Sequence, residues 1–216
     1  EVAIFLVGEV LEALDYAHRL SDPATGAALE LVHRDVSPHN VMVNFEGEAK
    51  LIDFGLAASR LKVERTRPDV VMGKMAYMPP EQARGEAVDG RIDQFASAVM
   101  LYELLTGRRY YEGMSFQDVF AIVCGNTPDG REYRPPGFNT LDAGMQSVLD
   151  GALRREPAER YPGCAELKDA LDNWLLDHRL RAGTRHVRKA MLACFEGELA
   201  AERELFAAAQ RVRTQS

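Results

Sequence analysis

The chain has 216 residues, of which 46% are hydrophobic and 27% charged, and its formal net charge at pH 7 is −7. These values describe one ordinary globular domain with room for a short appendage, and the negative charge argues against a nucleic-acid surface. No apolar run approaches the roughly twenty residues that cross a membrane, and no signal peptide is visible. Three scattered cysteines, Cys124, Cys164 and Cys194, lack metal-type spacing and favour a reducing cytoplasm.

The first twenty residues predict an amphipathic helix, because their apolar residues recur at helical spacing. These residues are Ile4, Val7, Val10, Leu11, Leu14 and Ala17. Turn-forming residues follow at 21–26, S-D-P-A-T-G, and predict an exposed loop. The first residue is Glu1 rather than methionine, so we expect a fragment of a longer protein.

Residues 31–43, L-V-H-R-D-V-S-P-H-N-V-M-V, place a short polar loop between two short apolar runs, 31–32 and 41–43. Such runs, bounded by Pro and Asn, are typical of paired strands with a rigid turn between them. The loop would then present Asp35 and Asn40 from a fixed platform. The simpler alternative is a hairpin whose Asp and Asn only form Asx turns.

A further strand is predicted at 50–52, after a turn that contains Glu46 and Gly47. The tripeptide D-F-G follows at 53–55. Residues 58–70, A-S-R-L-K-V-E-R-T-R-P-D-V, are charged and aperiodic, which favours a loop over a helix.

The rest of the chain is mainly helical by its periodicity. Residues 91–107 are apolar on nearly all sides, so we expect a buried helix that stops at Gly107. Further helices are predicted at 115–124, 141–153 and 164–176, between turns rich in Gly and Pro. Residues 179–216 predict one or two more amphipathic helices, which would either fold back on the body or bind a partner.

The motifs H-R-D-x-x-x-x-N at 33–40 and D-F-G at 53–55, followed by G-K-M-A-Y-M-P-P-E at 73–81, resemble the protein kinase family, in particular its larger C-terminal lobe. The resemblance implies an α+β fold that is mainly α, a protein-kinase-like C-lobe in which a short β-hairpin carries the catalytic and D-F-G loops. We take 1–178 as a partial kinase domain and 179–216 as a C-terminal helical extension. The small N-lobe is expected to be absent, because no G-x-G-x-x-G and no strand lysine of the V-A-I-K type occurs.

The resemblance also implies roles for the motif residues. Asp35 would be the catalytic base that accepts the substrate hydroxyl proton, and Asn40 and Asp53 would hold magnesium with ATP. Carboxylate and amide oxygens are hard donors of the kind that magnesium binds. His33, Phe54 and Gly55 complete the two motifs as structural residues.

Five more residues receive structural or regulatory roles by resemblance. Arg34 would pair with a phosphorylated residue between 56 and 76, with Thr66 as the first candidate; an ordinary solvated hydroxyl is the alternative. Glu81 would form a buried ion pair with Arg160. Asp93 would accept backbone N–H groups near His33 and Arg34, although a carboxylate at a helix N-terminus is also favoured by the helix dipole.

Two positions depart from the serine/threonine kinase pattern. Ser37 stands where a lysine usually contacts the γ-phosphate, and Lys74 stands where a threonine usually bonds the catalytic aspartate. Our hypothesis is that Lys74 supplies the charge that Ser37 cannot, the alternative being a lysine that points to solvent.

The expected function is ATP- and Mg²⁺-dependent phosphoryl transfer to protein serine or threonine hydroxyls, as in bacterial Hanks-type kinases. Tyrosine or dual specificity stays open because of Ser37. Without an N-lobe the isolated chain is expected to be weak or inactive, so a catalytically silent interaction module is the alternative. A partner or dimer contact would then use 179–216.

Overall fold

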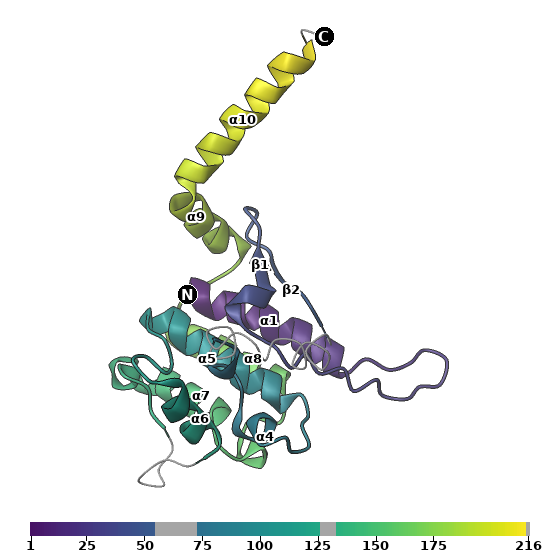
Figure 1. Ribbon diagram of the computed structural model, residues 1–216, viewed down its shortest axis with the longest axis vertical. Helices are drawn as coiled ribbons and strands as arrows, with labels where there is room; N and C mark the ends of the chain where they lie inside the picture. Colours follow the sequence, from purple (N-terminus) through teal and green to yellow (C-terminus); the bar gives the residue numbers. More distant parts are fainter. Residues whose placement is uncertain (55–72, 126–132, 215–216) are drawn as a thin grey trace.

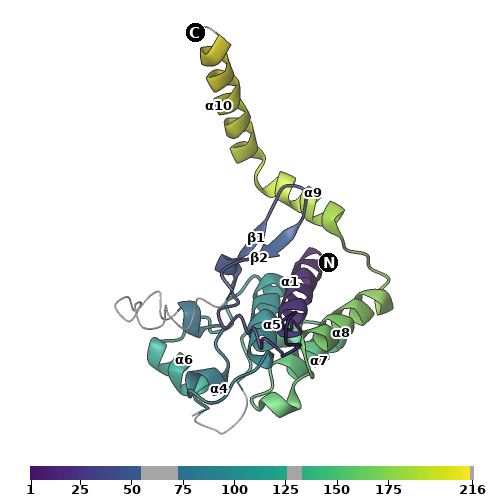
Figure 2. The ribbon, with the colours of Figure 1, turned by 90° about the vertical axis from the view of Figure 1, so that its right-hand side faces the viewer.

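The computed structural model describes residues 1–54, 73–125 and 133–214, with side chains described as far as Leu205. Its core is built around helix α5 (Arg91–Thr106), which lies beside α1 (Val2–His18) and α8 (Cys164–Asp177) (Figures 1 and 2). Residues from Ile92 to Tyr102 on α5 are all buried, as expected for a helix that is apolar on nearly all sides. Gly107 ends α5 in the left-handed conformation, with φ of 67°, as predicted for a C-terminal stop.

Shorter helices complete the lower part of the body in Figure 1. They are α4 (Pro80–Ala83), α6 (Phe116–Val123) and α7 (Ala143–Ala152), with single 3-10 turns at Pro38–Asn40, Phe138–Thr140 and Pro157–Glu159. Helix α6 begins with a reciprocal capping box between Ser115 and Asp118, and Asp142 caps α7. The predicted helices at 115–124, 141–153 and 164–176 are therefore confirmed to within two residues at each end.

A two-stranded hairpin lies against α1. Strand β1 (Val41–Val43) pairs with the antiparallel strand β2 (Ala49–Leu51), so that Met42 faces Lys50. The turn is set by the Asn44 side chain, whose Oδ1 accepts the backbone N–H groups of Glu46 and Glu48.

The prediction that 31–32 pairs with 41–43 was wrong, because residues 31–32 lie in no strand. The next two backbone N–H groups, of His33 and Arg34, donate to the Asp93 carboxylate instead of to a neighbouring strand. The Asp93 side chain thus accepts the hydrogen bonds that a paired strand would otherwise have accepted.

The C-terminal residues form α9 (Thr184–Cys194) and α10 (Glu196–Thr214). Helix α9 folds back on the body: Val187 is 1% exposed, Arg188 forms an ion pair with Glu46 at 2.9 Å, and the rings of Phe195 and Phe45 meet edge to face. Helix α10 instead projects away from the body (Figures 1 and 2). Of the two possibilities that the sequence left open, α9 therefore folds back on the body, while α10 leads away from it.

Among the described helices, none combines the length and apolarity that crossing a bilayer requires. The three cysteines are free thiols.

Candidate active site

The loop that carries Asp35 is held from below by Asp93 on α5. The Asp93 carboxylate accepts the backbone N–H groups of His33 and Arg34, each at 2.8 Å, and is itself 1% exposed. Arg34 has a φ of 67°, a left-handed conformation that disfavours most side chains. The two charge-assisted hydrogen bonds stabilise that strained backbone next to Asp35.

His18 is a member of the site that sequence reasoning missed. Its Nε2 lies 2.8 Å from Asp93 Oδ2, and because a carboxylate only accepts, Nε2–H is the donor. Its side chain is only 15% exposed. The apolar spacing of α1 held the signal, because His18 lies four residues after Leu14 on the buried stripe.

His33 joins the loop to the D-F-G segment. Its buried ring donates from Nε2 to the Ile52 carbonyl at 2.9 Å and accepts the Asp35 N–H at Nδ1, 3.3 Å away. Both contacts suit one neutral tautomer, with hydrogen on Nε2. The ring also meets Phe54 edge to face, with centroids 4.6 Å apart.

Asn40 and Asp53 lie on the same platform as Asp35. The Asn40 side-chain amide donates to the Asp35 carbonyl at 2.6 Å, and the Ile52 N–H donates to the Asn40 carbonyl at 2.9 Å. These bonds place the residue after Ile52, Asp53, beside Asn40. With its Nδ2 engaged, Asn40 can offer only Oδ1 to a cation.

The donor chemistry of Asn40 and Asp53 fits magnesium, which prefers oxygen ligands and keeps several waters or phosphate oxygens. Among the described residues, no three His, Cys, Asp or Glu side chains gather as a metal site. Two protein oxygens therefore suit a metal that arrives with a nucleotide rather than one caged by the protein alone.

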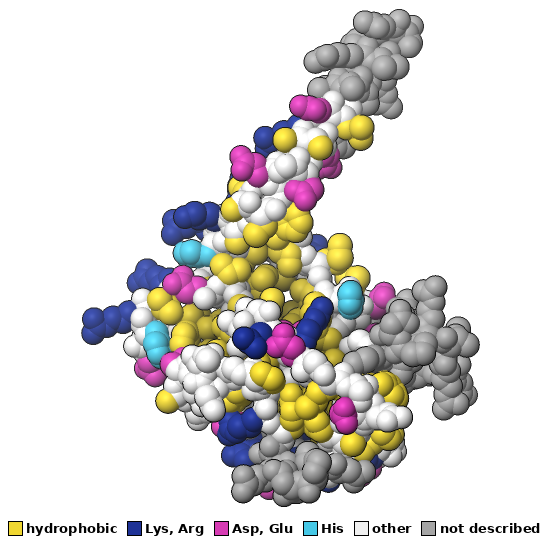
Figure 3. Space-filling model, turned by 60° about the vertical axis from the view of Figure 1, so that its left-hand side comes forward, with side chains coloured by type: hydrophobic (Ala, Val, Ile, Leu, Met, Phe, Trp, Pro, Cys, Tyr) yellow, Lys and Arg dark blue, Asp and Glu magenta, His cyan; other side chains and the backbone are white. Residues whose placement is uncertain are grey.

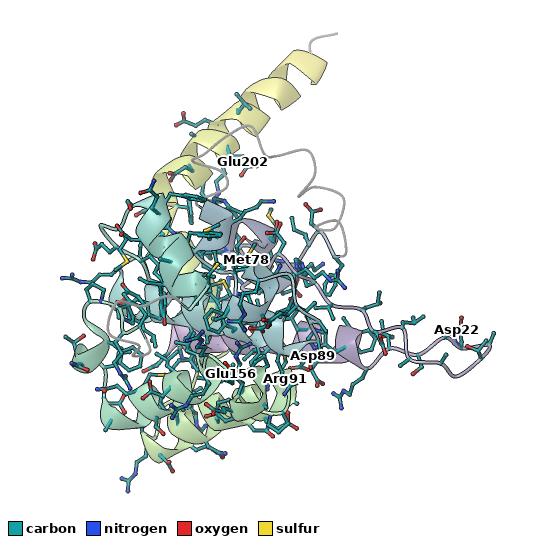
Figure 4. All side chains as sticks on the ribbon, turned by 60° about the horizontal axis from the view of Figure 1, so that its bottom comes forward. Asp22, Met78, Asp89, Arg91, Glu156 and Glu202 are labelled. Atoms are coloured by element: carbon teal, nitrogen blue, oxygen red, sulfur yellow. The ribbon has the colours of Figure 1, made fainter. Side chains whose placement is uncertain are left out.

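Lys74 lies next to Asp35, with Nζ 3.3 Å from Oδ2. The two side chains are 29% and 16% exposed, so the pair is only partly screened by water. A small cavity beside them is lined by Arg34, Asp35, Lys74, Tyr77, Met78 and Gln82; Figure 4 labels Met78 near the middle of the molecule. Ser37 is buried, at 7% exposed, and carries no charge into the site.

Glu81, the first acidic residue of α4, pairs with Arg160 as expected. The two guanidinium nitrogens of Arg160 donate to the two Glu81 oxygens at 2.7 and 2.8 Å, and both side chains are almost fully buried. Arg160 also donates to the carbonyls of Arg154 and Arg155 and stacks over Phe95. The pair thus joins α4 to the segment between α7 and α8.

A second network behind Lys74 was not anticipated. The Tyr77 hydroxyl donates to Glu103 Oε2 at 2.6 Å, and Arg109 donates to both groups. Burial, together with the Glu103 carboxylate, raises the pKa of Tyr77 above its ordinary value. This hydroxyl therefore stays protonated and ties the segment after Lys74 to α5.

A surface ion pair borders the Glu81–Arg160 contact, where Figure 4 labels Asp89, Arg91 and Glu156. The Arg91 guanidinium binds Asp89 and holds the pKa of that carboxyl below its ordinary value. Arg91 also donates to the Pro157 carbonyl at 3.0 Å, so it helps to hold the same segment.

Two predicted site residues, Gly55 and Thr66, lie outside the described residues. The structure therefore brings together Asp35, Asn40, Asp53, Lys74 and the supporting groups His33, Arg34 and Asp93.

Comparison with known proteins agrees with this geometry. The protein kinase domain model matches residues 1–172. Similar proteins include tyrosine-protein kinase MasK of Myxococcus xanthus (37% identical, over 84% of this chain and 28% of MasK), serine/threonine-protein kinase Pkn1 of Myxococcus xanthus (32%, over 89% and 27%) and serine/threonine-protein kinase PrkC of Bacillus subtilis (28%, over 79% and 25%).

The chain spans about a quarter of the length of these relatives. The Pkn1 match covers 89% of 216 residues, about 192, so it must run past residue 178 into α9. With a family model that covers most of its length and a site of matching geometry, the chain belongs to the protein kinase family.

Proposed function

We propose that this chain is the catalytic lobe of a protein kinase that transfers the γ-phosphoryl group of ATP to a protein hydroxyl. The observation that carries the proposal is the platform on which hydrogen bonds join Asn40 to Asp35 and to Ile52, the residue before Asp53. A phosphoryl transfer site needs positioned charge more than covalent chemistry, and this platform supplies it.

In the proposed reaction the Asp35 carboxylate takes the proton of the substrate hydroxyl. The freed oxygen then bonds to the γ-phosphorus while the bond from that phosphorus to the bridging oxygen of ADP breaks. Asn40 and Asp53 would hold magnesium, which when bound offsets the negative charge of the phosphates. Lys74, at 3.3 Å from Asp35, would place beside the γ-phosphate the positive charge that Ser37 does not supply, from the other side of Asp35.

Substrate class is proposed as serine or threonine. Most of the similar proteins that we name carry that description, although MasK is described as a tyrosine kinase. The Asp35 side chain is 16% exposed, so it is accessible to a protein segment as substrate. Free, scattered cysteines support a cytoplasmic setting.

Regulation through Arg34 is part of the proposal. The Arg34 side chain is exposed one residue before Asp35, where it could pair with phosphate on Thr66. Mass spectrometry of active protein should then find phosphate between residues 56 and 76. Fully active protein without phosphate there would contradict this part.

A catalytically silent interaction module is the second candidate. It is favoured by one observation: the Asp35 carboxylate already has an ion-pair partner in Lys74.

The deciding experiment measures transfer of labelled γ-phosphate to protein by two proteins. One is the 216-residue chain alone, and the other is the chain extended by the residues that any in-frame coding sequence upstream of Glu1 encodes. Asp35→Asn should lower the rate about 10²- to 10⁴-fold, as loss of a general base does, whereas Asp169→Asn on the surface of α8 should leave it unchanged. Acid hydrolysis of the product then distinguishes phosphoserine and phosphothreonine from phosphotyrosine. No transfer by either form of the protein would favour the silent module.

A further inference from the structure

Helix α9 and the first half of α10 carry opposite charge. Residues 179–189 hold five basic side chains and no acidic one: Arg179, Arg181, Arg185, Arg188 and Lys189. The first nine residues of α10 hold four acidic side chains and one basic one: Glu196, Glu198, Glu202, Glu204 and Arg203. The net charge of the whole chain is −7, so residues 179–189 form a local region of positive charge in an acidic protein.

The charges lie on matched helix faces. On α9, Arg185, Lys189 and Leu192 follow one another at i, i+4 and i+7, so they share a face. On α10, the same spacing joins Glu198, Glu202 and Leu205. All six side chains are exposed, with Leu192 at 38% and Leu205 at 73%.

The two faces do not satisfy each other within one chain. The helices meet at the bend at Phe195, and α10 then leads away from the body (Figure 1); Figure 4 labels Glu202 on this helix. Among the described side chains, no ion pair joins α9 to α10; Arg188 of α9 pairs instead with Glu46 on the hairpin. In Figure 3 the acidic side chains stand along α10 in open solvent.

Elementary helix energetics argue that both helices have an external partner. A cation in the first turn of a helix opposes the helix dipole, and α9 has Arg185 there with no acidic residue. Most helical stability in proteins comes from packing of an amphipathic face, and α10 leads away from its own body. An anionic surface over α9 and a cationic surface over α10 would correct both deficits.

We propose that the partner is a second copy of this chain, with α9 of each copy lying against α10 of the other. A two-fold dimer makes every contact twice, so one chain supplies both the basic and the acidic surface. Leu192 and Leu205 would pack at the ends of the two charged rows. Charge complementarity of this kind sets partner choice and register, and it weakens with salt.

The test uses two charge-reversed variants of the 216-residue chain, measured by analytical ultracentrifugation over a range of concentrations. Arg185→Glu with Lys189→Glu makes both faces acidic, and Glu198→Lys with Glu202→Lys makes both faces basic. Each variant alone should dimerise roughly a hundredfold more weakly than the wild type, because like charges then face each other. An equal mixture of the two should form a 1:1 heterodimer, in which both contacts again pair opposite charges.

A matched control, Glu166→Lys with Asp169→Lys on the exposed face of α8, changes the net charge as much as the second variant and should dimerise like the wild type. The proposal is overturned if the wild type stays monomeric, or if either variant dimerises as tightly as the wild type. It is also overturned if the mixture fails to associate while wild type does. A monomer that binds vesicles of anionic phospholipid through α9 would assign the basic face to a membrane surface instead.

Discussion

Lys74 and Ser37 distinguish this site from the usual serine/threonine pattern at the scale of single residues. Because Lys74 is the cation beside Asp35, Lys74→Met should abolish phosphoryl transfer in the complete kinase. Ser37→Lys combined with Lys74→Thr moves the cation to the other side of Asp35 and should restore transfer to within about tenfold of wild type. Steady-state rates of ATP-dependent substrate phosphorylation measure both effects.

Lys168→Met serves as the control for the Lys74 prediction, because Lys168 is an ion-paired lysine on α8 and should be replaceable without loss of rate. An active Lys74→Met enzyme would show that the Lys74–Asp35 pair has no part in transfer. A double variant as inactive as Lys74→Met would show that the two positions cannot exchange the cation.

The residue scale also shows what could be predicted from sequence. The motifs were sufficient to name Asp93 and its backbone partners, because both the carboxylate and the loop stand at fixed motif positions. His18 was missed because it belongs to no such motif, and only the packing of α1 against α5 brings its ring to Asp93. Its place on the apolar stripe of α1 was the available signal, and a buried polar residue on such a stripe needs a partner.

At the scale of elements, the Glu81–Arg160 pair is expected to hold α4 in place. Removing one partner leaves the other as an uncompensated buried charge, so Arg160→Met should lower the free energy of unfolding by about 3–5 kcal/mol. Glu81→Met combined with Arg160→Met should recover part of that loss, since no charge then stays buried. Urea denaturation followed by circular dichroism measures each variant.

The surface pair Arg84–Glu86 provides the control for the buried one. Its geometry is similar, with 2.6 Å between Arg84 Nε and Glu86 Oε1, but Glu86 is exposed. Arg84→Met should therefore change stability little, because water screens the pair. An Arg160→Met protein as stable as Arg84→Met would contradict the view that burial gives the Glu81–Arg160 pair its strength.

Gly47 is expected to set the contact between the hairpin and α9. A Cβ at Gly47 would lie 2.0 Å from the Thr184 carbonyl oxygen, so Gly47→Ala must move α9 off the hairpin turn. Gly85 has a similar positive φ, 71° against 87°, but open space around it, so Gly85→Ala tests the backbone strain alone. Gly47→Ala should cost about 1–3 kcal/mol more than Gly85→Ala, and amide hydrogen exchange should speed up across α9. Equal costs for the two alanines would mean that the close approach carries no energy.

The helices were predictable where the apolar residues recur at a single helical spacing. Helix α5 and the three later helices of the body follow from their apolar spacing and from the Gly and Pro between them. The strand predicted at 31–32 failed because a short apolar run does not reveal what its backbone N–H groups bind. Those that follow it bind a carboxylate on α5, sixty residues further along the chain.

At the scale of the whole molecule, the sequence predicted a domain boundary near residue 178. The contacts of α9 with the body indicate which residues after 178 add to the stability of the fold. The segment up to Phe195 buries Val187 and adds the Glu46–Arg188 and Phe45–Phe195 contacts. Pattern alone could not show this, because α9 is amphipathic and an amphipathic helix packs equally well on its own body or on a partner.

Two truncations separate the roles of α9 and α10. A chain that ends at Phe195 keeps every contact between α9 and the body, so in dilute solution, below the range where dimers form, its Tm should equal that of the 216-residue chain. A chain that ends at His178 loses the burial of Val187 and its two neighbouring contacts, about 2–3 kcal/mol, and for a domain of this size its Tm should fall by roughly 5–10 °C. Differential scanning calorimetry compares the three chains at one protein concentration below that range, because dimerisation would otherwise raise the Tm of the longest one. If the chain ending at His178 has the same Tm as the other two, α9 contacts the hairpin without stabilising the fold. Gly47→Ala should then cost no more free energy of unfolding than Gly85→Ala.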